Sequence, residues 1–116
     1  MPQITVDYSD RLADVLDRRA FALELHPLTA GIVNTRVERC KTRFRRVETV
    51  VADGAPEHAV VHVEVALKRG RTAETLKELV QAVLELVDKH TAAADGTVVH
   101  ASVEVRDLTE AYASSR

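Results

Sequence analysis

The chain has 116 residues, which predicts a single domain over residues 1–116 with one core. Its formal net charge of −2 and isoelectric point near 6.2 argue against a protein that binds nucleic acid through a strong overall positive field, so any cationic site must be local. With two Phe, two Tyr and no Trp, the core must be built from Val, Leu, Ala and Ile, and association would help so small a core.

The single cysteine, Cys40, excludes an intrachain disulfide and a cysteine zinc cluster. A lone thiol fits a reducing compartment, and we expect the cytoplasm. The first 30 residues carry many charges, and no apolar run approaches the roughly 18 residues that span a membrane. We therefore expect neither a targeting signal nor a membrane as partner.

Residues 2–8 predict a short apolar strand that opens with Pro2. Proline is small enough for the initiator methionine to be trimmed, and the nitrogen of Pro2, an amide without basicity inside a chain, then becomes a secondary amine. Burial beside cations would lower the pKa of that amine toward neutrality, where a general base works best. Pro2 is therefore a candidate catalytic base, and the alternative is that it only begins an edge strand.

Residues 9–10 offer a cap for an amphipathic helix. Its recurring apolar residues are Leu12, Val15, Leu16, Ala20 and Leu23. Pro27 disfavours the α conformation in the residue before it and lacks a backbone donor, which predicts a kink or break there. A looser segment is expected to follow through residues 31–35.

The second strand is expected to start near Val37, and residues 40–51 alternate in polarity. Three cations, Lys41, Arg43 and Arg45, fall on one face of this strand. The adjacent pair at residues 45–46 breaks the alternation, which predicts a bulge or a change in the buried face. Residues 52–56 predict a turn.

The remaining segments predict a third strand over residues 58–68, a helix capped by Thr72 and a fourth strand over residues 97–106. The apolar residues of this helix are Leu76, Leu79, Val80, Val83, Leu84 and Val87. The element order is β-α-β twice, which predicts an α/β chain of the α+β two-layer type, a four-stranded sheet with two helices on one face. The two halves resemble a structural duplication.

The face of this sheet without helices needs a partner, and we expect a homo-oligomer packed through it. Val60 and Ala66 lie on this face among His62, Glu64, His100 and Glu104. Imidazole and carboxylate are common metal ligands. Polar pairs at a subunit interface, or solvated side chains, are the favoured interpretation of these four residues, and no metal site is predicted.

Arg71 directly precedes the predicted helix cap Thr72, where unpaired backbone N–H groups and the helix dipole favour an anion. Lys68 and Arg69 add to that field, although a turn rich in lysine and arginine is commonly plain solvated surface. The segment lacks the glycine pattern of a phosphate loop, and the chain lacks aromatic platforms for nucleic acid. A small polycarboxylate is the better expectation.

Five short motifs together resemble the 5-carboxymethyl-2-hydroxymuconate isomerase family of the tautomerase superfamily. They are MPQITVDYS (residues 1–9), CKTR (40–43), ADG (52–54), VHV (61–63) and GRT (70–72). The resemblance runs in matching order from residue 2 to about residue 112 and implies a tautomerase-like fold. It also implies a homotrimer in which an N-terminal proline shuttles a proton in an unsaturated di- or triacid while arginines hold the carboxylates.

By this resemblance Pro2 is the catalytic base and acid, and the substrate-binding residues are Lys41, Arg43 and Arg71. The family has arginine where Lys41 stands, and lysine lacks the planar fork that binds a carboxylate in two places. The implied reaction requires no metal or organic cofactor. Two alternatives stay open, which are a broad keto–enol tautomerase and a non-catalytic module for small-ligand binding or assembly.

Overall fold

A computed structural model describes all 116 residues of the chain. The strands and α-helices are, in chain order, β1 (Gln3–Ser9), α1 (Arg18–Val33), β2 (Lys41–Val47), β3 (His58–Leu67), α2 (Ala73–Thr91) and β4 (Val98–Asp107). Two short 3₁₀ turns, Asp10–Leu12 and Val37–Arg39, precede α1 and β2. Neither helix is long and apolar enough to cross a membrane.

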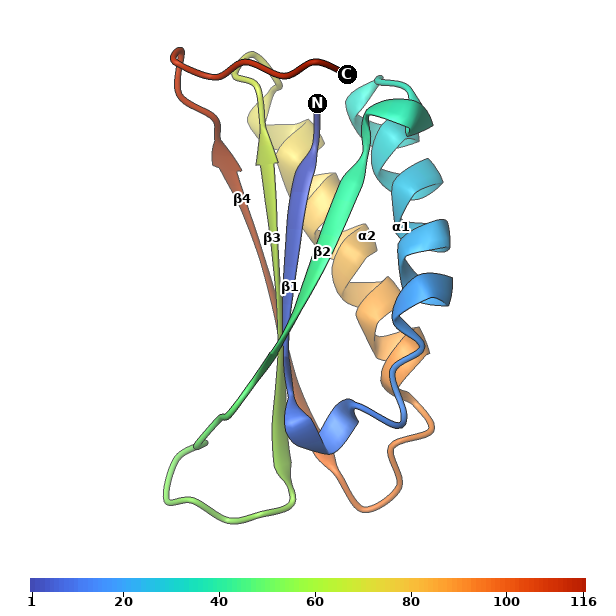
Figure 1. The fold of residues 1–116 in the computed structure, drawn as a ribbon, viewed down its shortest axis with the longest axis vertical. Coiled ribbons are helices and arrows are strands. Elements are labelled where there is room, and N and C mark those ends of the chain that lie inside the picture. Colours follow the sequence, from blue (N-terminus) through green and yellow to red (C-terminus); the bar gives the residue numbers. More distant parts are fainter.

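The four strands form one mixed sheet in the order β2-β1-β3-β4. β1 is parallel to β2, β3 is parallel to β4, and the two central strands are antiparallel. Each parallel pair is joined through a helix, and Figure 1 shows both helices on the same side of the sheet. The expected α+β fold with a duplicated β-α-β unit is therefore confirmed.

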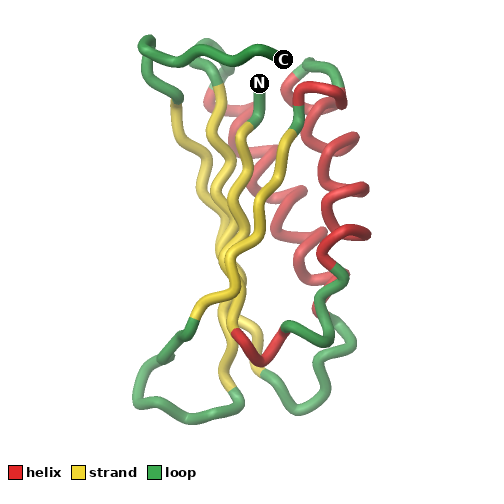
Figure 2. Tube along the Cα trace, viewed as in Figure 1, coloured by secondary structure: helices red, strands yellow, loops and turns green.

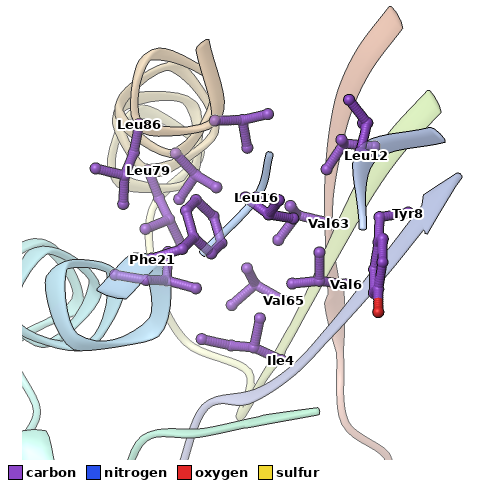
Figure 3. Close-up of a cluster of buried hydrophobic side chains, with 14 of the residues drawn as sticks. Ile4, Val6, Tyr8, Leu12, Leu16, Phe21, Val63, Val65, Leu79 and Leu86 are labelled. Carbon is purple, nitrogen blue, oxygen red and sulfur yellow. The ribbon is translucent and has the colours of Figure 1, made fainter. Parts of the chain in front are cut away.

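A cluster of 17 buried apolar residues fills the space between the sheet and the helices. Alternation in β1 and β3 directs Ile4, Val6, Val63 and Val65 toward this space, where they meet Phe21 of α1 and the leucines of α2 (Figure 3). The core contains only one Phe and one Tyr, so aliphatic side chains form most of it, as the composition predicts.

α1 begins eight residues later than a cap at residues 9–10 would place it, and that prediction was wrong. Ser9 is buried, and its Oγ accepts a hydrogen bond from the Val60 N–H at 2.7 Å and lies 2.5 Å from Thr49 Oγ1, so it is not free to cap a helix. Asp17 is the cap instead and accepts from the Ala20 N–H at 3.0 Å. The shift turns Leu23 outward, 57% exposed.

The helix continues through Pro27 to Val33, so the predicted break and the loose segment at residues 31–35 were also wrong. Pro27 is exposed, and the carbonyl left without its usual donor, that of Leu23, belongs to an exposed residue that water can reach. Asn34 ends the helix in the left-handed conformation, with φ of 57°, which asparagine tolerates better than most residues.

β2 starts at Lys41 rather than near Val37, because residues 37–39 form a 3₁₀ turn, and it ends at Val47. Its pairing with β1 continues without interruption from Gln3↔Lys41 to Ser9↔Val47, so the predicted bulge is absent. The turn at residues 52–56 and the two remaining strands lie within a residue or two of their predicted positions, and Thr72 caps α2 by accepting from the Thr75 N–H at 3.2 Å.

Polar side chains on the face without helices pair with one another. Arg45 contacts Asp7 at 2.6 Å, Arg106 donates to Glu64 at 2.9 Å, and His62 Nδ1 lies 2.6 Å from Ser102 Oγ. Two of the four residues considered as metal ligands, His62 and Glu64, thus have polar partners within the chain.

Candidate active site

One end of the sheet gathers most of the chemistry-bearing residues that the sequence singles out. β1 and β2 begin at this end and β3 and β4 finish there, so four connecting segments meet (Figure 1). They are residues 1–2, residues 36–40, the loop at residues 68–72 and the C-terminal residues 108–116. The last segment crosses this end of the sheet as a loop, above the N-terminus in Figure 2. Lysine and arginine outnumber aspartate and glutamate in these segments.

Pro2 is buried at this end, and its carbonyl accepts a hydrogen bond from the Lys41 N–H at 3.2 Å. Along β1 the even-numbered residues Ile4, Val6 and Tyr8 face the helices. Pro2 is also even-numbered, so it lies on the same side of the sheet. With Met1 in place the nitrogen of Pro2 is an amide, and the amine at this position belongs to Met1. In the structure the chain-terminal amine thus belongs to half-buried Met1, directly before the buried Pro2.

The pKa of the Met1 amine is lowered from its ordinary value of 8.0. Partial burial is the main cause, and the positive charge of Arg71 is the next. Arg39 and Lys68 lower it further, while Cys40 acts in the opposite direction. Three cations from two different segments thus act on the one amine.

Arg71 is held in place by two backbone carbonyls. Its Nη1 donates to Lys68 O at 3.0 Å and its Nη2 donates to Val33 O at 3.2 Å, which ties the loop before α2 to the end of α1. Gly70 has a φ of 118°, a backbone conformation that residues other than glycine rarely adopt. Glycine therefore permits the loop to reverse at this position. The guanidinium is therefore fixed beside the amine.

Lys41 and Arg43 lie differently from Arg71. Both are paired in register with residues of β1 that face away from the helices, so their side chains start from the uncovered face. Lys41 Nζ donates to Arg39 O at 3.4 Å and to Arg116 O at 3.0 Å, and Arg43 donates to Gln3 Oε1 at 2.9 Å. Within one chain the structure brings Arg71 to the amine, and it does not bring Arg43 there.

Arg39 is a cation near the amine that the sequence reasoning missed. Its Nη1 lies 2.9 Å from Met1 Sδ. The alternating pattern led to a strand from Val37 onward, in which Arg39 has no special position, whereas the 3₁₀ turn carries it to the chain terminus. Only the density of cations in residues 36–43 could have pointed to it.

Cys40 and His26 contact each other near the start of β2. Cys40 is buried, and burial raises the pKa of its thiol, which keeps it protonated and unreactive. Its Sγ contacts the His26 carbonyl at 3.7 Å, and His26 Nε2 lies 2.7 Å from Thr42 Oγ1. These residues have the contacts of packing groups, and neither is a candidate nucleophile.

Two open hollows of similar size lie at this end. One, of about 350 Å³, is lined by Lys68, Arg69, Leu108, Thr109, Glu110 and Tyr112. The other, of about 340 Å³, is lined by Arg36, Glu38, Arg39, Ser115 and Arg116. Five of these eleven residues are cationic and two are acidic, which suits a small anion.

Comparison with known proteins connects this arrangement to one family. The family model of 5-carboxymethyl-2-hydroxymuconate isomerase matches residues 2–116. The Escherichia coli protein described as 5-carboxymethyl-2-hydroxymuconate Delta-isomerase is 26% identical over 110 residues, which cover 93% of this chain and 87% of that protein.

Solved structures agree with the fold. The crystal structure of a 5-carboxymethyl-2-hydroxymuconate isomerase from Deinococcus radiodurans R1 superposes with a TM-score of 0.85 at 24% identity, over 99% of this chain and 88% of that one. A fused 4-OT described as a wild-type symmetric trimer superposes with a TM-score of 0.70 at 20% identity, over 91% of this chain and 85% of that one. The chain belongs to the 5-carboxymethyl-2-hydroxymuconate isomerase family, a family of enzymes within the tautomerase superfamily.

Proposed function

We propose that this isomerase moves a proton within an unsaturated di- or tricarboxylic acid of aromatic catabolism, as the names of its relatives indicate for 5-carboxymethyl-2-hydroxymuconate, and that Pro2 is the general base and acid. The observation that carries the proposal is the terminal amine, which is partly buried and lies under the influence of Arg71, Arg39 and Lys68. Such an environment favours the neutral amine near neutral pH, which is the form that accepts a proton.

The proposed mechanism starts with removal of Met1, which converts the nitrogen of Pro2 into a secondary amine. The amine accepts a proton from the dienol hydroxyl or from an acidified carbon of the substrate, and the double bonds shift along the conjugated system. The resulting ammonium returns a proton to another carbon, so one group is base and then acid. The nearby cations stabilise the dienolate that forms between the two steps.

Arg71 is the proposed carboxylate-binding residue within the chain, because its guanidinium is fixed by two carbonyls beside the amine. We propose that Lys41 and Arg43 contribute to the site in the assembled protein, because the sheet face that carries them is the one that we propose packs against other copies of the chain. Their side chains start from that uncovered face. A homotrimer is the proposed assembly, supported by the unpartnered sheet face and by the trimer reported for the fused 4-OT relative.

We also propose the cytoplasm as the compartment, since the one cysteine is free and buried.

The test is isomerisation of 5-carboxymethyl-2-hydroxymuconate, followed by ultraviolet absorbance with protein whose loss of Met1 has been verified by intact mass. Pro2→Ala and Arg71→Ala should each lower kcat/KM roughly a hundredfold or more. Arg69→Ala is the matched control, because Arg69 lies in the same loop and pairs at 3.8 Å with Asp107. A mass that retains Met1, or full activity in Pro2→Ala, would contradict the mechanism.

The same assay separates the proposal from a broad keto–enol tautomerase. That activity would give faster turnover of phenylenolpyruvate, a simple enol with one carboxylate, than of the carboxylated muconate. Absence of turnover with either compound would favour a binding or assembly module.

A further inference from the structure

Arg39 has only one side-chain hydrogen bond, the 2.9 Å contact of its Nη1 with Met1 Sδ. A guanidinium offers five N–H donors, and a thioether sulfur is a weak acceptor. No ion pair includes this half-buried arginine. Most of its hydrogen-bonding capacity is therefore unused at the end of the sheet where the amine lies.

That single contact is with the residue that the proposed mechanism removes. When Met1 leaves, Arg39 keeps its place and loses its one acceptor. Its charge already lowers the pKa of the terminal amine of the chain together with the charges of Arg71 and Lys68, and Cys40 acts in the opposite sense when its thiol is ionised. A carboxylate that entered beside Pro2 would meet a guanidinium with no competing protein acceptor.

The backbone holds Arg39 firmly at this position. Its N–H donates to Arg36 O at 2.9 Å, and its carbonyl accepts from Lys41 Nζ at 3.4 Å. The next residue, Cys40, is buried and donates through its N–H to Val37 O at 2.9 Å. A side chain on a fixed turn loses less conformational freedom when it binds a ligand.

Lys41, the position at which the family's arginine would be expected, already has two acceptors within the single chain. Its ammonium donates to the Arg39 carbonyl and to a terminal carboxylate oxygen of Arg116, so in this chain it fastens the C-terminal residues to the turn. Arg39 provides the planar guanidinium, able to donate two parallel hydrogen bonds to one carboxylate, that is missing at position 41 because lysine stands there. The hollow of about 340 Å³ beside Arg39 contains three arginines and one acidic residue, Glu38.

We infer that Arg39 is a substrate-binding residue, whose guanidinium binds one carboxylate of an unsaturated dicarboxylic acid while Arg71 binds the other. The inference rests on the proposed function and names a residue that determines which acids the site accepts. The two guanidiniums come from separate segments, the turn before β2 and the loop before α2, so together they select for an acid with two carboxylates.

The experiment compares Arg39→Gln with Arg19→Gln in protein free of Met1. Arg19 is an exposed arginine near the start of α1, the end of that helix away from Arg71. It lines neither hollow and is not among the charges that act on the amine. Arg39→Gln should lower kcat/KM roughly tenfold or more, mainly through a higher KM, since a hydrogen bond to a charged group is lost. Arg39→Lys should recover part of the loss, and Arg19→Gln should stay near wild type.

Two further readouts are independent of turnover. The affinity for muconate, an unsaturated dicarboxylate, measured by calorimetry should fall in Arg39→Gln and not in Arg19→Gln. The Pro2 amine, followed by NMR with ¹⁵N-labelled proline, should titrate at higher pH in Arg39→Gln, because loss of a cation favours protonation, while Arg71, Lys68 and Cys40 are unchanged. A purely structural role would change thermal stability without these effects.

Equal muconate affinity and equal amine titration in the two variants would overturn the inference, whatever the activity. If Pro2→Ala abolishes turnover while Arg39→Gln behaves like Arg19→Gln, the proposed function stands and the role of Arg39 fails. If wild type shows no turnover but Arg39→Gln alone loses muconate affinity, the carboxylate site stands and the proposed reaction fails.

Discussion

The chemistry of the candidate site depends on which residue carries the terminal amine. Met1 carries it in the structure, half-buried beside Arg39 and Arg71, and trimming would transfer it to the buried Pro2. The residues around this position have few protein acceptors and several positive charges, so an anion is the ligand that they favour. At the scale of single residues, the site is a set of cations arranged around one amine.

The pH dependence of activity should report this arrangement. A base must be neutral to accept a proton, so kcat/KM should fall as pH drops below the pKa of the Pro2 amine. Arg71 is the strongest charge that lowers the amine pKa in the structure, so Arg71→Gln should move the acid limb of the pH profile to higher pH. The pH dependence of kcat/KM measures the shift, with Arg69→Gln as control, and an unmoved limb would exclude Arg71 as the cause.

At the scale of elements, α1 shows how tertiary contacts overrule local preferences. Pro27 and Gly31 both lie inside the helix and both disfavour it. The helix forms nevertheless because Phe21, Leu25 and Val33 are buried against the sheet and α2. Because packing holds the helix in spite of these two residues, replacing either one with a better helix former should raise the free energy of unfolding.

Pro27→Ala should raise the free energy of unfolding by roughly 1–3 kcal/mol, because it restores a helical hydrogen bond at an exposed position. Gly31→Ala should add roughly 0.5–1 kcal/mol, since a Cβ at this site meets no atom within 4 Å. Urea unfolding followed by circular dichroism at one protein concentration measures both. A lower free energy of unfolding in Pro27→Ala would contradict this prediction and would indicate that Pro27 contacts another copy of the chain.

His26 joins α1 to β2 through its contact with Thr42, and burial lowers the pKa of its imidazole from 6.5. The unfolded chain then binds a proton more readily than the folded one. The stability that neutral His26 contributes should therefore be complete above pH 6.5 and be lost as pH falls through the lower pKa of the folded state. The unfolding free energy of His26→Gln, measured from pH 8 to 5, should depend less on pH than that of wild type, and identical slopes would contradict this assignment.

At the scale of the whole molecule, one sheet face is covered by helices and the other by nothing in the chain (Figure 1). Charges on the uncovered face are paired within the chain, as in Arg45 with Asp7 and Arg106 with Glu64. Paired charges are less costly to bury against another copy than single ones. This face is therefore suited to the homotrimer that we propose.

Val60→Asp should weaken that assembly, because it adds an unpaired charge to the part of β3 that faces the proposed interface. Sedimentation velocity should give a mass of three chains for wild type and a smaller mass for the variant at the same concentration. Leu23→Asp, on the exposed side of α1, is the control and should keep the wild-type mass. A wild-type mass of one chain would contradict the trimer.

Periodicity was sufficient to predict four strands, two helices and their layers, because alternation with period two and apolar recurrence near 3.6 depend on neighbouring residues alone. The same reasoning failed where contacts with residues far away in the chain determine the local conformation. Ser9 has the side chain of a helix cap, but β3 and the loop after β2 engage its hydroxyl. Arg39 has the sequence context of a strand residue, but it lies in a 3₁₀ turn at the chain terminus.

The amino-acid sequence by itself determined the fold class, the candidate base Pro2 and the cationic loop that ends in Arg71, since each depends on residue type and short spacing. Only the tertiary structure decided the strand order, the start of α1 and which cations surround the amine. Strand pairing brings together residues that are dozens of positions apart in the chain, and an electrostatic site depends on distances in space. Arg43 therefore lies, like Lys41, on the face away from the helices, while Arg71, nearly 70 residues from Pro2 in the chain, acts on the terminal amine.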